Sequence, residues 1–88
     1  MGYVYEIEKP HIFTEEGQRK FLIVRDNVKT LLQRAGAVRM QEAIRGVSGD
    51  SWQHLAYVDR LVELGELREL NFGPCAGQHR VFVAGNGK

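Results

Sequence analysis

The chain has 88 residues, enough for one small domain with a single core but too few for a catalytic domain built around a large pocket. Apolar residues make up 43% and charged residues 26%, a composition typical of globular proteins rather than of disordered tails. The formal net charge of +1 counts against a strongly basic nucleic-acid binder.

Three features of the sequence bear on the cellular compartment of the protein. The longest apolar run, residues 21–24, is far too short to cross a membrane. The first residues lack the basic region and apolar core of a secretory signal. Cys75 is the only cysteine and cannot form an internal disulfide, so we expect a cytoplasmic protein.

Residues 3–13 alternate weakly between apolar and polar side chains, and Pro10 removes a backbone donor. We therefore expect an edge strand or an extended arm. This arm carries the apolar side chains of Tyr3, Tyr5, Ile12 and Phe13, which need a surface to lie against. That surface belongs either to the same subunit or to a partner.

A long helix is predicted from residue 15 to Ala35. Thr14 suits the N-cap, two glutamates suit the first turn, and Gly36 suits the C-terminal stop. The apolar positions recur at three- and four-residue spacing: Phe21, Leu22, Val24, Val28, Leu31, Leu32 and Ala35. The helix is longer than one small core requires, so we expect a homodimer formed through it and through the residue 3–13 arm, unless the arm completes its own subunit's core.

The middle of the chain predicts a short strand at residues 37–38 and a short helix with Met40, Ala43 and Ile44 on its buried side, closed by Gly46. Val47 is expected to point inward and Ser48 to cap the next helix. A third helix is predicted over residues 50–64, with one buried stripe that begins at Trp52 and continues through Leu55, Val58, Leu61 and Val62. Leu64 and Gly65 end it.

Two β-prone runs follow, at residues 66–70 and 80–83, and turn-forming residues fill the segment 71–79 between them. We predict that the two runs pair as a hairpin. Residues 1–13 are then an arm, residues 14–84 one domain and residues 85–88 a disordered tail.

The order helix, short strand, helix, turn, helix and hairpin resembles the winged helix-turn-helix superfamily over roughly residues 14–83. Gly46 lies at the turn, with Trp52 and Leu55 six and nine positions later, where this superfamily packs its third helix against its second. Residues 61–67, LVELGEL, look like the LxxLGxL segment that leads into the wing of many bacterial regulators. The expected fold is therefore α+β: three helices and a small antiparallel wing sheet.

The resemblance implies that the helix over residues 50–64 enters the major groove of DNA. Gln53 would bond adenine, Ser51 and His54 would reach base edges, and Tyr57 and Arg60 would lie near phosphates. Backbone contacts would come from Arg39, Arg45, His79 and Arg80. Trp52 is expected in the core, where its removal would destabilise the domain.

The expected function is sequence-specific binding of double-stranded DNA by a small dimeric transcriptional regulator. No catalytic residue, metal or cofactor is expected. The alternative is a winged-helix module that binds protein through its acidic third helix and the aromatic arm. A continuous positive rim of Arg39, Arg45, Arg60 and Arg80 would favour DNA, and a broken or negative rim would favour protein.

Overall fold

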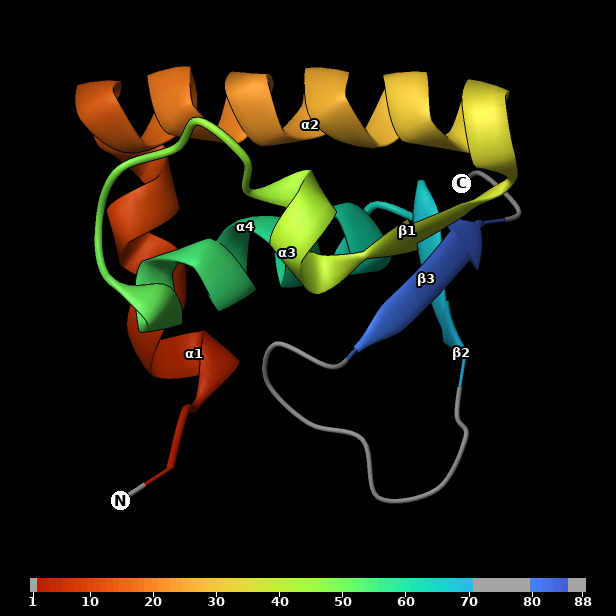
Figure 1. The fold of residues 1–88 in the computed structure, drawn as a ribbon. Helices are drawn as coiled ribbons and strands as arrows, with labels where there is room; N and C mark the ends of the chain where they lie inside the picture. The colour runs from red at the N-terminus through yellow and green to blue at the C-terminus, as the bar shows by residue number, and fades with distance from the viewer. Residues whose placement is uncertain (1, 71–79, 86–88) are drawn as a thin grey trace.

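The computed structural model describes residues 2–70 and 80–85 of the chain (Figure 1). The elements in chain order are helix α1 (Tyr5–Glu8), the 3₁₀ helix η1 (Lys9–Phe13), α2 (Glu15–Ala35), β1 (Ala37–Arg39), α3 (Met40–Ala43), α4 (Ser51–Glu63), β2 (Leu67–Leu70) and β3 (Val81–Ala84). The expected α+β class with a small antiparallel sheet is confirmed. The predicted 71–79 segment and most of the predicted tail lie outside the described residues.

Helix α2 spans the molecule and covers α3, α4 and the sheet from one side (Figure 1). It begins where the sequence predicts, because the Thr14 hydroxyl accepts a 3.0 Å hydrogen bond from the Gly17 N–H. It ends at Gly36, whose φ of 74° is a left-handed conformation that glycine adopts without strain. Phe21, Val24 and Val28 bury its inner side.

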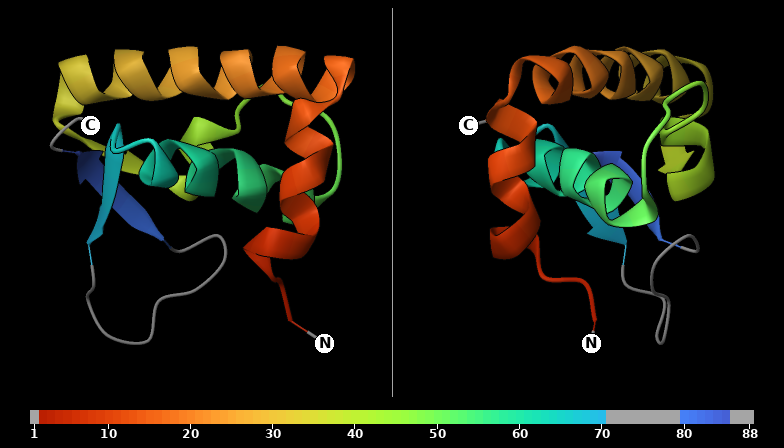
Figure 2. Two further views of the ribbon diagram at one scale, coloured as in Figure 1. Left: turned by 180° about the vertical axis from the view of Figure 1, so that it is seen from behind. Right: turned by 90° about the vertical axis from the view of Figure 1, so that its left-hand side faces the viewer.

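The sheet has the strand order β1-β3-β2, and both strand pairs are antiparallel. Val38 of β1 lies opposite Phe82 of β3, and both side chains are fully buried beneath α2 and α4. The pairing of β2 with β3 confirms the predicted hairpin. Since β2 follows α4 after only three residues, the hairpin lies directly beside the C-terminal end of α4 (Figure 2, left).

The predicted edge strand or extended arm at residues 3–13 is wrong, because this segment is helical and folds back on its own subunit. Pro10 lies in the first turn of η1, where a backbone donor is not needed. Ile12 is fully buried, and Gly17 lets the first turn of α2 approach the His11 carbonyl so closely that a Cβ would clash with it. The 3₁₀ helix is thus anchored in the core.

Helix α4 begins at Ser51, and its cap is Asp50 rather than Ser48, because the Asp50 carboxylate accepts a 2.9 Å hydrogen bond from the Gln53 N–H. Its buried side also differs from the predicted stripe. Trp52 is 40% exposed, so its placement in the core is wrong. The buried residues are His54, Ala56, Tyr57, Val58 and Leu61.

The different buried side of α4 has a physical cause. This helix contacts α3, against which the resemblance places it, and it also contacts α2, β2, α1 and η1. The N-terminal segment therefore buries positions on α4 that a domain without the segment would expose to solvent. Figure 2 shows α1 and η1 standing beside α4 from two directions.

Candidate nucleic-acid interface

The outward side of α4 carries Trp52, Ala56, Asp59 and Glu63. Their spacing of four, three and four residues places them on one stripe, roughly opposite the buried Val58 and Leu61. Trp52 at the first turn is exposed, whereas Ala56 one turn later is only 1% exposed. The stripe is therefore open to solvent at its N-terminal end and covered one to two turns further along, at Ala56 and Asp59.

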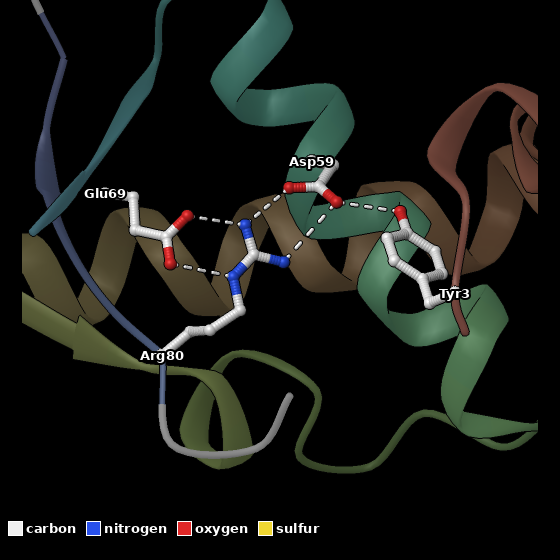
Figure 3. Close-up of polar contacts among 4 residues, drawn as sticks. All are labelled: Tyr3, Asp59, Glu69 and Arg80. Atoms are coloured by element: carbon white, nitrogen blue, oxygen red, sulfur yellow. Dashed lines mark hydrogen bonds and ion pairs between the residues drawn. The ribbon is translucent and has the colours of Figure 1, made fainter. Parts of the chain in front are cut away.

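Asp59 is the centre of a polar network that joins three parts of the fold (Figure 3). Its Oδ2 accepts a 2.7 Å hydrogen bond from the Tyr3 hydroxyl. Its Oδ1 lies 2.6 Å from Nη2 of Arg80, the residue just before β3. Arg80 also contacts Glu69 of β2 through Nε at 3.0 Å and Nη2 at 2.8 Å.

The charges in this network are largely hidden from solvent, since the side chains of Arg80 and Asp59 are 13% and 17% exposed. Burial alone would lower the pKa of Arg80, but the hydrogen bonds to Glu69 and Asp59 outweigh burial and raise that pKa above its ordinary value. Burial and the hydrogen bond to Asp59 raise the pKa of Tyr3. Arg80 therefore stays charged and Tyr3 stays a donor, while two carboxylates neutralise the arginine.

Glu63 forms a second cluster on the same stripe, one turn after Asp59. Its carboxylate accepts 2.8 Å hydrogen bonds from Lys9, Tyr5 and Arg60. These three hydrogen bonds lower the pKa of Glu63 to about 2, and the one from Lys9 has the largest effect. The Arg60 guanidinium also lies over the Phe13 ring, 5.2 Å from its centroid. The last two turns of α4 thus hold the N-terminal segment through side-chain contacts.

The predicted base-contacting residues are not all exposed. Ser51 is exposed, and Gln53 is partly buried beside Lys20 in a polar pocket of about 200 Å³. His54 is 8% exposed and its Nε2 lies 3.2 Å from the Ser48 carbonyl oxygen, while Tyr57 is only 2% exposed. The expectation that His54 and Tyr57 lie on the exposed side of the helix is wrong, because the buried side of α4 is rotated toward them.

The predicted positive rim is broken. Arg39 and Arg45, at the two ends of α3, are exposed, and neither guanidinium has an ion pair with the described residues. Arg60 and Arg80 are instead neutralised by Glu63 and by the pair Asp59 and Glu69. His79, the remaining predicted backbone contact, lies outside the described residues.

Sequence reasoning missed the roles of Tyr3, Tyr5, Glu63 and Glu69. The spacing of Asp59 and Glu63 does place two carboxylates on one side of the helix, and this signal is available from the sequence. Their partners are not, since Tyr3 and Asp59 are 56 residues apart.

No protein-family model, no curated protein and no solved structure matches this chain. Within residues 2–70 and 80–85, none of the helices combines the length and apolar character that crossing a membrane requires.

Proposed function

We propose that this chain is a winged helix-turn-helix domain that binds double-stranded DNA and acts as a small transcriptional regulator. The element order α2, β1, α3, α4, β2, β3 supports the first part of the proposal. So do the placement of β1 against β3 and the start of the hairpin directly after α4. In such domains the third helix, here α4, lies in the major groove with its N-terminal residues toward the bases.

The observation that carries the proposal is the open first turn of α4. Ser51 and Trp52 are exposed there, and Gln53 is partly exposed beside them. Ser51 and Gln53 offer hydrogen bonds to base edges, and the Trp52 ring offers apolar contact. Arg39 and Arg45, on either side of α3, are exposed and form no ion pair with the residues that the structure describes, which makes them candidates for phosphate contacts.

A second function has one specific observation in its favour. The rim is broken at Arg60 and Arg80, and the carboxylates of Asp59 and Glu63 lie on the outward stripe. Carboxylates near phosphates are unfavourable, so this stripe suits a protein partner better than a phosphate backbone. The alternative is a winged-helix module that binds protein through α4.

Binding to random-sequence duplex DNA at two salt concentrations separates these functions. DNA binding through Arg39 and Arg45 gives an affinity that falls as salt rises, because each phosphate contact releases counterions. The variants Arg39→Gln and Arg45→Gln should each lower the salt slope by about one unit. Arg19→Gln is the matched control, since Arg19 is an exposed arginine on α2 whose nearest carboxylate, Glu16, lies 3.5 Å away.

If the Arg19→Gln control lowers the salt slope by the same amount, net charge rather than the position of the arginine determines DNA binding. Absence of salt-dependent binding by the unmodified chain would contradict the DNA-binding proposal and leave protein binding as the better account.

A further inference from the structure

The N-terminal segment has two parts that are attached to the domain differently. Residues 9–13 form η1, which is anchored by the fully buried Ile12 and by the close approach of Gly17 to the His11 carbonyl. Residues 2–8 contain only the four-residue helix α1, which has no buried residue. Val4 and Ile7 in this part are exposed. Residues 2–8 therefore contribute no fully buried side chain, and their departure would uncover only the surface of α4 that they contact.

Residues 2–8 are held by a few side-chain hydrogen bonds and by two partly buried rings. The hydroxyl of Tyr3 donates to Asp59, and the hydroxyl of Tyr5 donates to Glu63. Lys9, at the junction with η1, also bonds Glu63. The rings of Tyr3 and Tyr5 are partly buried against the core. Part-exposed hydrogen bonds of this kind contribute modestly to stability, so such a segment opens more readily than the core does.

The position of these contacts has a consequence for DNA. Asp59 and Glu63 lie on the same stripe of α4 as Trp52, seven and eleven residues further along. An α-helix with its side chains is about 10–12 Å wide, close to the width of about 12 Å of the major groove. A helix that carries a second chain segment on its outward side is too wide to lie along that groove.

We propose that residues 2–8 are an intramolecular cover of α4, which DNA must displace before α4 can lie in the major groove. This inference rests on the proposed DNA binding. In the covered conformation the outward stripe of α4 is open at Trp52, closed at Ala56 and partly open again at Glu63. Displacement couples the two events, because the cover and the groove compete for one side of the helix. The uncovered carboxylates of Asp59 and Glu63 would then have to face base edges, where a carboxylate can accept a hydrogen bond from the cytosine amino group, rather than phosphates. The apparent affinity for DNA is reduced by the fraction of molecules that are uncovered.

The double variant Tyr3→Phe, Tyr5→Phe tests the proposal. It removes the two hydroxyl donors, keeps both rings and leaves the net charge unchanged, so any effect on DNA binding cannot come from altered long-range attraction. Losing these hydrogen bonds should raise the uncovered fraction, and with it the affinity for DNA, by about tenfold. Gln33→Met is the control, because it replaces an exposed, uncharged side chain on α2 that lies outside the pocket lined by Arg45, and it leaves the net charge unchanged.

Two measurements are made on each full-length chain. The first is amide hydrogen exchange of Ile7 and Glu8, whose N–H groups donate to the Val4 carbonyl at 3.1 and 3.3 Å, with Val28 of α2 as the internal reference. The second is the affinity for random-sequence duplex DNA at one fixed salt concentration. We expect the double variant to exchange about tenfold faster at Ile7 and Glu8 but not at Val28, and to bind DNA about tenfold more tightly.

Each other outcome overturns the proposal in a recognisable way. Exchange at Ile7 as slow as at Val28 in the double variant would show that the segment does not separate from the core. Faster exchange with unchanged affinity would show that the segment does not cover the DNA-binding side, and would leave the proposed function standing. Absence of DNA binding by the unmodified chain and by the variant would overturn the cover and the proposed function together.

Discussion

Asp59 of α4 and Arg80, which precedes β3, form an ion pair with an N–O distance of 2.6 Å, although they are 21 residues apart in the chain. Both side chains are less than one-fifth exposed. The pair fixes the hairpin against the outward side of α4, and Tyr3 attaches the N-terminal segment to the same carboxylate. Asp59 thus joins α4, the sheet and the N-terminal segment.

Replacement of Asp59 by Asn should destabilise the domain by about 1–3 kcal/mol, because Arg80 loses one of its two carboxylate partners while it stays mostly buried. Urea denaturation measures this change. In the background of Arg80→Gln the same replacement should cost less, since the partner is already absent. If Asp59→Asn lowers the free energy of unfolding equally in both backgrounds, the ion pair with Arg80 does not contribute to stability.

Trp52→Ala should cost no more than about 1 kcal/mol of folding free energy, because the side chain is well exposed and leaves no closed cavity. Leu61→Ala on the buried side of the same helix should cost about 2–5 kcal/mol. Thermal denaturation of the two variants compares them directly. A loss of stability in Trp52→Ala as large as that in Leu61→Ala would place the tryptophan in the core after all.

The stability contributed by Glu63 should depend on pH in a defined window. Its pKa is about 2 in the folded chain against an ordinary value of 4.5, so the folded state binds this proton less readily than the unfolded state. The contribution is fully present above about pH 4.5 and is lost as the pH falls toward 2. It should also shrink at high salt, because the side chain is 36% exposed.

An NMR titration of the Glu63 carboxyl carbon measures this pKa. The variant Tyr5→Phe should raise it, since one of the three hydrogen-bond donors is removed. A titration at the ordinary value in the unmodified chain would mean that Lys9, Tyr5 and Arg60 do not hold the carboxylate in solution.

The homodimer remains a prediction. The structure leaves α2 as the better candidate for its contact surface. Tyr3 and Tyr5 lie on their own subunit, so the exposed apolar pair Leu22 and Ile23 on α2 is the better candidate for the contact. Light scattering at micromolar concentration should give twice the mass of one chain, and Leu22→Gln should return it to the monomer mass. A monomer mass for the unmodified chain would rule the dimer out.

Local chemistry made much of the fold predictable. Thr14 and Gly36 fix the ends of α2 by capping and by left-handed backbone, both of which depend on neighbouring residues alone. Leu64 and Gly65 end α4 in the same way, with a φ of 79° at the glycine. The hairpin follows from two short β-prone runs that the chain brings together directly after the helix.

The candidate site was less predictable because it depends on contacts between distant parts of the chain. Pro10 suggested an extended segment, but in the first turn of a 3₁₀ helix it is equally well placed. Once that segment lies beside α4, Ala56 and Tyr57 become buried and Trp52 is left exposed. Periodicity alone cannot show which side of a helix a separate segment covers.

The central claim is that the open first turn of α4 contacts double-stranded DNA, and the fluorescence of Trp52 tests it most directly. Trp52 is the only tryptophan in the chain, so its emission reports on this turn alone. A duplex titrated into the protein at low salt should change the emission saturably, and added salt should reverse the change. Emission that stays constant while excess duplex is added would contradict the claim.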